Sequence, residues 1–307
     1  MKTPLQPLNH LEVFHGEASA ALARVYARID APFCQPNWSL TGHIQGPYRH
    51  DAHTLPTTTP LVPHKAGASL LAEAVIPDPC GWAPTAPNVY QLSVTLRDGE
   101  TLIQQRQVTT GIRALGTAGP DIFRQGKRCV FRAVEAITAD IDDWNDWQST
   151  QATMLVTSPS QELVQQATAL GVPLIVQLPN HLPTMEQQLH ELAHWPSISL
   201  VYTDADQPMI PKPQQRFPNL LFAQRVDSNN LKPPTLAEWC QVVLWDVGDK
   251  PNVDLLIPAM QTTMPVLAIR RRAMKSTMLE DRAECDRLQA DLAHIMDCAG
   301  YLIMKKK

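Results

Sequence analysis

Residues 173–206 read PLIVQLPNHLPTMEQQLHELAHWPSISLVYTDAD, two short apolar runs on either side of an amphipathic segment. The runs 173–179 and 197–203 are rich in aliphatic and β-branched residues, whereas the apolar residues of 184–195 recur at helical spacing. A strand, a helix and a second strand in this order form the repeating unit of parallel sheets and barrels. The stretch therefore predicts an α/β domain.

The same alternation extends from about residue 117 to the C-terminus. Eight segments have strand character: 127–134, 152–158, 173–179, 197–203, 219–226, 241–247, 265–271 and 300–304. Helical candidates lie between most of them, including 160–170, 184–195, 236–240 and 276–298. Eight strands alternating with helices predict a compact (β/α)8 barrel of the TIM type over residues 117–307, near the lower size limit of about 200 residues for this fold.

The first 116 residues have a different pattern. Short runs of alternating polar and apolar residues are bounded by Pro, Gly, Asn or Asp, as in 21–30, 69–76, 89–98 and 102–113. This pattern is typical of an antiparallel β-sandwich. We therefore expect a multi-domain β and α/β protein, with an immunoglobulin-like sandwich over residues 1–116 followed by the barrel.

Composition excludes several functional classes. A net charge of -4, from 26 basic and 30 acidic residues, provides no basic field for nucleic acid. No stretch approaches the roughly 18 apolar residues of a membrane span, so we expect a cytoplasmic protein without a transmembrane segment. Because the cysteines lack CxxC spacing, we expect free thiols and neither a metal nor a cofactor. They are Cys34, Cys80, Cys129, Cys240, Cys285 and Cys298.

Three segments occur in a recognisable order: CGWAPTAPNVYQLSVTL (80–96), TTGIRALG (109–116) and FRQGKRCVFRAV (123–134). They resemble the junction of glycoside hydrolase family 2, the β-galactosidase and β-glucuronidase group. There a sandwich ends with a W-x-P-x-x-P-x-x-Y segment and a G-x-R strand before the first barrel strand. The matching residues here are Trp82, Pro84, Pro87, Tyr90, Gly111, Arg113, Gly126, Lys127 and Arg132.

The resemblance also implies where catalytic residues would lie. In that family the fourth barrel strand ends in an acid/base glutamate preceded by a sugar-binding asparagine, and the seventh ends in a nucleophilic glutamate. Aligned from Pro196, these positions hold Asp206 and Ala205, and aligned from Pro265 the nucleophile position holds Arg270. A guanidinium has no lone pair with which to attack. We therefore expect no catalytic residues at the usual positions, and an Asp206–Arg270 pair across the barrel mouth.

Other side chains remain candidates. Asp204, Asp206 and Asp246 are the carboxylates that an active site would use if the catalytic groups had moved. Arg132, Asp204 and Trp245 are candidate ligand-binding residues on predicted barrel strands. Asp204 and Asp206 are close enough in sequence to share a cation, but no nearby His or Glu completes a ligand set. We therefore expect no metal site.

These observations lean away from an enzyme and predict a non-catalytic, glycosidase-like protein that binds or supports a protein partner or a glycan. The alternative is an active retaining β-glycosidase with relocated carboxylates. The last predicted strand is followed only by three lysines, which leaves no length for a helix over it. Because an uncovered apolar wall is unfavourable in water, we expect a protein partner or a second copy to bind near Gly300–Met304.

Overall fold

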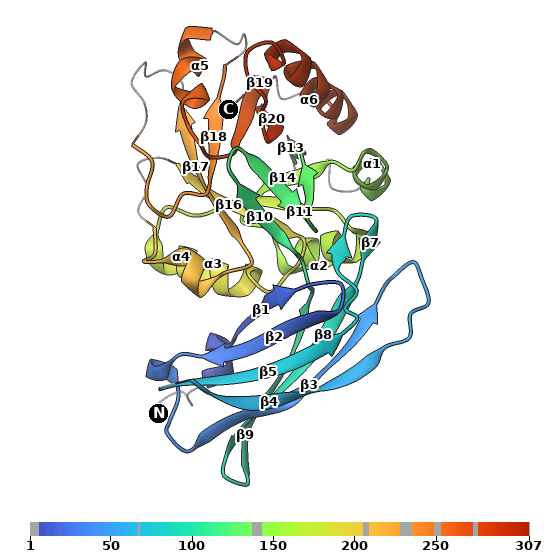
Figure 1. Cartoon of the computed structure of the whole chain (residues 1–307), viewed down its shortest axis with the longest axis vertical. Coiled ribbons are helices and arrows are strands. Elements are labelled where there is room, and N and C mark those ends of the chain that lie inside the picture. The colour runs from blue at the N-terminus through green and yellow to red at the C-terminus, as the bar shows by residue number, and fades with distance from the viewer. Residues whose placement is uncertain are drawn as a thin grey trace. The chain divides into compact units, whose positions relative to one another are not determined.

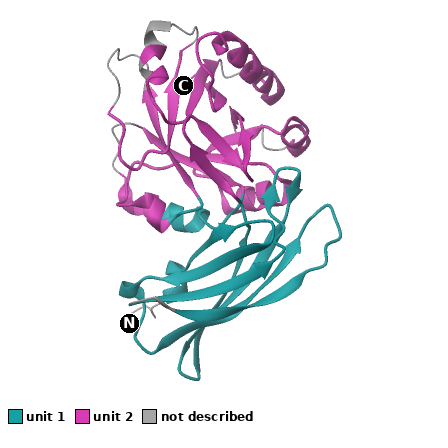
Figure 2. Cartoon of the chain, in the orientation of Figure 1, with its two compact units in different colours: residues 1–113, 187–196, 217–219 teal, residues 114–186, 197–216, 220–307 magenta. Residues whose placement is uncertain are grey.

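The computed structural model describes residues 6–66, 68–136, 143–204, 209–227, 235–248, 253–272 and 276–306. Contacts within the chain divide it into two compact units (Figure 2). The first comprises residues 1–113, 187–196 and 217–219, and the second comprises residues 114–186, 197–216 and 220–307. Each unit has its own hydrophobic core.

The first unit contains an antiparallel sandwich, which confirms the predicted fold (Figure 1). Its strands are β1 (Glu12–Ala18), β2 (Leu22–Ile29), β3 (Trp38–Tyr48), β4 (Thr57–Ala66), β5 (Ser69–Pro77), β8 (Val89–Asp98) and β9 (Thr101–Thr110). Their hydrogen-bonded order is β1-β2-β5-β4-β3-β8-β9. Because β4 pairs with β3 over residues 57–61 and with β5 over residues 62–66, it passes from one layer to the other.

Alternation of side chains explains why these segments form a sandwich. In β2, Ala23, Val25, Ala27 and Ile29 are buried, while the intervening residues are only partly buried. Both layers contribute to one core, which includes Leu40 of β3. The remaining short elements are η1 (Pro7–His10), η2 (Ala31–Phe33), β6 (Trp82–Ala83) and β7 (Ala86–Pro87).

The second unit contains a closed barrel of parallel strands, as predicted. The strands are β13 (Phe131–Glu135), β14 (Thr153–Thr157), β15 (Leu174–Gln177), β16 (Ile198–Asp204), β17 (Leu221–Asp227), β18 (Val242–Asp246), β19 (Val266–Arg272) and β20 (Gly300–Lys305). Their core consists of alternate residues of each strand, such as Leu200 and Tyr202 of β16 or Leu267 and Ile269 of β19. The barrel interior is therefore packed with side chains.

The first predicted barrel strand, 127–134, is divided in the structure. Its beginning forms β12 (Lys127–Cys129), which joins β10 (Leu115–Ala118) and β11 (Asp121–Arg124) in a separate antiparallel sheet. Only the part from Phe131 onwards enters the barrel. Ile122 of β11 is fully buried and belongs to the barrel core.

Six helices accompany the barrel strands among the described residues. They are α1 (Trp144–Thr150), α2 (Gln161–Leu170), α3 (Leu182–Leu192), α4 (Pro213–Arg216), α5 (Val253–Met260) and α6 (Met278–Leu292). α2 begins where the Ser160 hydroxyl accepts a hydrogen bond from the backbone N–H of Leu163, and ends at Gly171 with φ 75°. The helix expected at 236–240 is wrong, because residues 238 and 239 form a turn and the other three have no regular structure.

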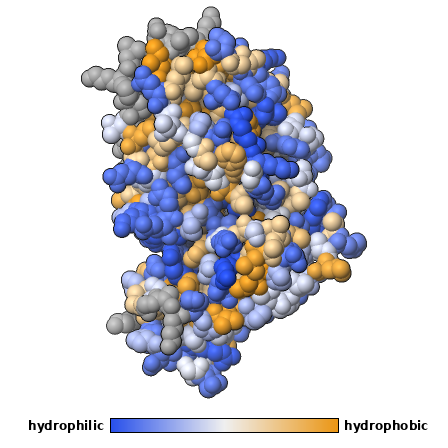
Figure 3. All heavy atoms as spheres, in the orientation of Figure 1, coloured by the Kyte–Doolittle hydropathy of each residue, from blue (hydrophilic) through white to orange (hydrophobic). Residues whose placement is uncertain are grey.

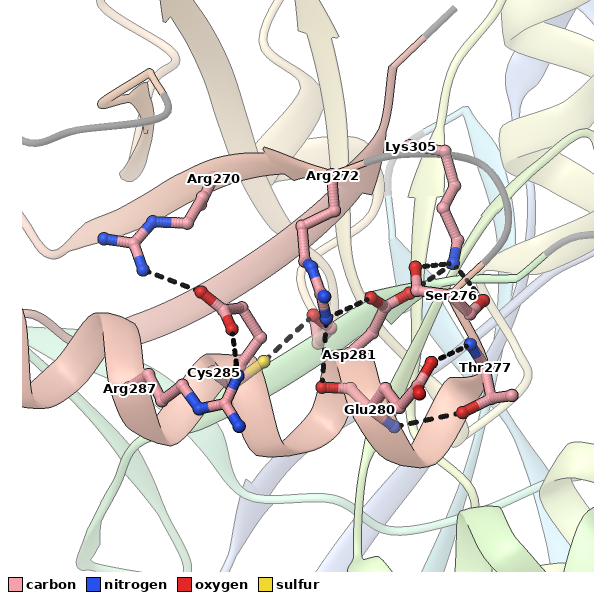
Figure 4. Close-up of polar contacts among 11 residues, drawn as sticks. Arg270, Arg272, Ser276, Thr277, Glu280, Asp281, Cys285, Arg287 and Lys305 are labelled. Carbon is pink, nitrogen blue, oxygen red and sulfur yellow. Dashed lines mark hydrogen bonds and ion pairs between the residues drawn. The ribbon is translucent and has the colours of Figure 1, made fainter.

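The barrel wall at Gly300–Met304 is not exposed, so the expectation of an uncovered wall is wrong, whereas the binding of a partner near it stays a prediction. Helix α6, which precedes β20 in the sequence, packs over both β20 and β13. Every residue of β20 is buried. Figure 4 shows Lys305 at the end of β20 reaching Ser276 and Asp281 at the beginning of α6. The element that covers β20 is therefore helix α6, which precedes β20 in the sequence, and no segment after the last strand is needed.

Two surface properties bear on the environment of the chain. Within the described ranges, no helix is both long and apolar enough to cross a membrane. On the face drawn in Figure 3, hydrophobic residues are interspersed with hydrophilic ones instead of forming one broad patch.

Candidate functional site

The C-terminal ends of the barrel strands carry charged side chains in a position where barrel enzymes place their active sites. Successive residues of a barrel strand point alternately inwards and outwards. Counting two residues on from an inward core residue gives the next inward position: Ala133 leads to Glu135, Tyr202 to Asp204, Ala223 to Arg225, Leu244 to Asp246 and Ile269 to Arg271. We call these five charged residues the mouth layer.

Two ion pairs connect neighbouring strands in the mouth layer. Arg225 Nε lies 2.7 Å from Asp204 Oδ1, and the strand register places these two residues directly opposite each other. Arg271 Nε donates to Asp246 Oδ2 at 2.6 Å. Asp246 Oδ1 also accepts the backbone N–H of Gly248 at 3.1 Å. Both carboxylates are therefore engaged by guanidinium groups.

Tyr202 lies one inward position below the mouth layer and is fully buried. Burial raises the pKa of its phenol; Arg225 lowers it to a smaller extent, and Glu135 raises it further. Its hydroxyl has no hydrogen-bond partner among the residues that the structure describes. The remaining acid, Glu135, accepts the backbone N–H of Lys305 at 2.6 Å through Oε2. The mouth layer thus lies above a neutral buried phenol.

Asp204 and Asp246, two of the predicted carboxylates, face the barrel interior and belong to this layer. Asp206 and Ala205 lie outside the described residues. The expectation that Arg270 faces the barrel mouth is wrong. Arg270 NH1 donates to Glu284 at 2.8 Å and NH2 to Asp291 at 2.6 Å, so the side chain points outwards to α6 (Figure 4). The inward residue at the end of β19 is the next one, Arg271.

Arg132 and Trp245 do not line the mouth either. Arg132 Nε donates to Asp286 at 2.7 Å and NH2 to Gln289 at 2.6 Å, which places the guanidinium on α6 outside the barrel. Trp245 is 1% exposed and lies between the inward residues Leu244 and Asp246, so its indole faces outwards. Neither side chain is placed to contact a sugar in the barrel mouth, and a role of either in binding a ligand elsewhere stays a prediction.

The sequence patterns did not single out Arg225, Arg271, Glu135 or Tyr202. The signal that identifies them is the period of two along each strand, counted from its apolar core residues. In β19, this count distinguishes Arg271 from Arg270.

The residues of the recognised junction have structural contacts within the first unit. Trp82 is fully buried. A Cβ on Gly111 would lie 2.6 Å from Pro196 Cγ, so a larger residue does not fit without movement. Arg113 NH1 donates to the Pro196 carbonyl at 2.5 Å, and its backbone N–H donates to His15 Nε2 at 3.1 Å. These contacts fix three separate segments of the unit to one another.

A model of the family described as Glycosyl hydrolases family 2 matches residues 37–113. The resemblance to glycoside hydrolase family 2 is confirmed. The match covers most of the sandwich and ends at Arg113, the last residue of the G-x-R motif. No curated protein matches the sequence.

Solved structures with similar folds include family 2 enzymes. Bacteroides uniformis beta-glucuronidase 2, covalently bound to cyclophellitol-6-carboxylate aziridine, is 13% identical with a TM-score of 0.65, covering 96% of this chain and 45% of that one. Dictyoglomus thermophilum beta-D-glucuronidase is 12% identical with a TM-score of 0.65, covering 96% and 61%. A putative beta-galactosidase from Bacteroides fragilis is 10% identical with a TM-score of 0.63, covering 97% and 54%.

These likenesses show that the chain has the sandwich-plus-barrel fold. The chain spans only about half the length of the solved structures that it matches. At such identities, the reaction of a neighbour is not transferred with its fold.

Proposed function

We propose that this glycosidase-like protein does not hydrolyse glycosides and acts as a binding or scaffold subunit. The observation that carries the proposal is the C-terminal end of β19, the seventh barrel strand. In the family that the chain resembles, this strand ends in the nucleophilic glutamate. Here it ends in Arg270, Arg271 and Arg272, and the next acidic residue in the sequence is Glu280 in α6. A guanidinium stays protonated and cannot attack an anomeric carbon.

The carboxylates that remain in the mouth layer also support the proposal. A retaining glycosidase needs two carboxyl groups about 5–5.5 Å apart, one to attack and one to protonate the leaving oxygen. Asp204 and Asp246 each hold an arginine instead, at 2.7 and 2.6 Å. Either group would have to break its ion pair before it reacted with a sugar, and Arg225 or Arg271 would then lose that carboxylate partner.

We expect the protein to show no turnover of a panel of 4-nitrophenyl β-glycosides that includes the glucuronide, galactoside, glucoside and mannoside. The measurement is release of nitrophenol by the wild type and by Glu135→Gln, Asp204→Asn, Asp206→Asn and Asp246→Asn. Asp286→Asn is the matched control, because Asp286 lies on α6 and pairs with Arg132 outside the barrel.

Turnover by the wild type that disappears in a mouth variant but persists in Asp286→Asn would contradict the proposal. It would establish the alternative, a retaining glycosidase with relocated carboxylates. Traces of turnover that are equal in all five variants would come from a contaminant and would leave the protein inactive.

A further inference from the structure

The outer face of β1, β2, β5 and β4 presents an ordered row of side chains in the first unit. Phe14 lies opposite Tyr26, Tyr26 opposite Glu73, and Glu73 opposite Val62. Their neighbours along each strand, such as Val25 and Ala74, are buried in the sandwich core, so the row faces outwards. We call this row, together with Arg24 and Val75 beside it, the Tyr26 face.

Two aromatic rings form the middle of the Tyr26 face. The rings of Phe14 and Tyr26 are stacked, with centroids 5.4 Å apart and an angle of 27° between their planes. The guanidinium of Arg28 lies 5.2 Å from the centroid of the Phe14 ring. A Cβ on Gly16 would lie 2.9 Å from Tyr26 Cε2, so the absence of a side chain there makes room for the ring edge. The position of the Tyr26 ring is therefore fixed by its surroundings.

Hydrogen-bonding groups lie directly beside the Tyr26 ring. Glu73 Oε1 accepts from Arg24 NH1 at 2.5 Å and from the Tyr26 hydroxyl at 3.1 Å. Within the described part of the chain, Glu73 Oε2 accepts no hydrogen bond, and Arg24 Nε and NH2 donate none. The Arg24 side chain is 39% exposed. One oriented acceptor and two donors are thus available next to an aromatic ring.

The charges of this surface are paired with one another. Arg24 pairs with Glu73, and Arg28 donates to Glu12 Oε2 at 2.8 Å through Nε and lies 3.5 Å from Asp30. Two cations and three anions repel an acidic ligand, and because each anion already has an arginine partner, they attract a basic ligand only weakly, so the complementary ligand is uncharged. Val62 and Val75 are 55% and 38% exposed and add apolar surface on either side of Glu73.

An uncharged sugar chain fits these groups. Neighbouring hydroxyls of a sugar offer a donor and an acceptor side by side, which a carboxylate oxygen and a guanidinium N–H complement. The C–H face of the same ring is apolar and can lie on an aromatic side chain. Binding sites of this kind combine apolar contact area with a few oriented polar groups.

We propose that the Tyr26 face binds a neutral oligosaccharide, with one sugar ring against Tyr26 and two adjacent hydroxyls held by Glu73 and Arg24. This inference rests on the proposed function in one respect: it names a ligand for a protein that is proposed to bind without hydrolysing. It uses no residue of the barrel.

The test is calorimetric titration of the full chain with cellohexaose, xylohexaose and laminarihexaose, with hexagalacturonate as the charged comparison. We expect saturable binding of at least one neutral hexasaccharide and none of the acidic one. Tyr26→Ala and Glu73→Gln should each weaken binding by about tenfold or more, the loss expected from one good contact. Gln107→Ala, at an exposed position of β9, is the matched control and should bind like the wild type.

A second pair of variants distinguishes the effect of the Tyr26 ring position on binding from an effect of unfolding. Tyr26→Phe retains the ring and should bind more tightly than Tyr26→Ala. Gly16→Val should displace the ring and weaken binding, while Gly16 itself is exposed and outside the core. Urea unfolding of each variant shows whether it is folded. If Tyr26→Ala does not fold, Glu73→Gln still tests the proposal.

Failure of all neutral hexasaccharides to bind overturns the inference, as does binding that Tyr26→Ala and Glu73→Gln leave unchanged. A dimer of the wild type that Tyr26→Ala dissociates, without sugar binding, also overturns it and makes this face a protein interface. Chromatography of the hexasaccharide after titration separates the two proposals. If the sugar binds at the Tyr26 face but is cleaved, the proposed function fails and the inference stands.

Discussion

Asp281→Ala is expected to lower the free energy of unfolding of the barrel unit by about 3–5 kcal/mol. The Asp281 carboxylate is fully buried and forms an ion pair with Lys305, whose side chain is 4% exposed. Lys305 Nζ also donates to the Ser276 carbonyl at 2.7 Å and to its hydroxyl at 2.8 Å (Figure 4). Removal of the carboxylate would leave a buried ammonium without its counter-charge, which is the costly case.

Hydrogen–deuterium exchange of peptides from α6 and β20 measures this effect. Exchange should become about 100-fold faster or more, because each 1.4 kcal/mol corresponds to a factor of ten. Asp286→Ala is the surface control, since its carboxylate is 55% exposed, and should change the opening free energy by less than about 1 kcal/mol. The double variant Asp281→Leu with Lys305→Met should recover most of the loss, because both charges are then absent. Equal exchange in Asp281→Ala and the wild type would contradict this role of the pair.

Much of the fold could be predicted from the sequence because its apolar patterns are regular. Strand β8 coincides with the predicted run 89–98, and its residues alternate between partly buried and buried along almost their whole length. The buried runs of β15 and β16 were equally clear. The division of 127–134 into two strands could not be predicted in this way, because β12 and β13 are nearly continuous in sequence and differ only in their strand partners. Strand pairing is set by contacts distant in sequence, which local patterns do not contain.

The candidate site was predictable only in part. An alignment anchored at Pro265 placed Arg270 at the mouth, whereas the structure directs it to α6 and points Arg271 inwards. A shift of one residue along a strand moves every side chain to the other face. The burial of β20 could not be predicted either, because it depends on α6 packing over β13 and β20, and this tertiary arrangement leaves no local pattern in the sequence. In contrast, the loss of acidic residues from the end of β19 could be read directly from the sequence.

The stability of the first unit is expected to fall as the pH decreases from 6.5 to 4. Burial lowers the pKa of His15 to about 4, and the nearby Arg113 contributes. His15 Nε2 accepts the backbone N–H of Arg113 at 3.1 Å, and Nδ1 faces the Gly16 carbonyl at 3.2 Å, so the ring is held neutral. His194 lines the same small cavity, and burial lowers its pKa to about 4, with a smaller effect from Arg106. Since His194 keeps part of its surface exposed, we expect it to contribute less.

The sign of the effect follows from proton binding. The folded state keeps both histidines neutral down to about pH 4, whereas the unfolded chain takes up protons below about pH 6.5. The stability is therefore highest above pH 6.5, falls as the pH decreases from 6.5 to the folded-state pKa of about 4, and loses nothing further from these groups below that pH. A difference of about 2.5 pH units corresponds to about 3 kcal/mol for His15. Carboxylates whose pKa is lowered, such as Glu73, lose their contribution at still lower pH.

Urea unfolding at pH 7, 6, 5 and 4 measures this dependence in the wild type, His15→Gln and His53→Gln. Glutamine can still donate and accept hydrogen bonds but does not titrate, so His15→Gln should be less stable than the wild type at pH 7 and lose less stability between pH 6 and pH 4. His53 is exposed, and its replacement should leave the wild-type slope intact. If His15→Gln retains the full slope, protonation of His15 does not cause the loss. The acid-sensitive groups then lie elsewhere in the unit, and the contact between His15 and Arg113 stabilises the fold without making it respond to pH.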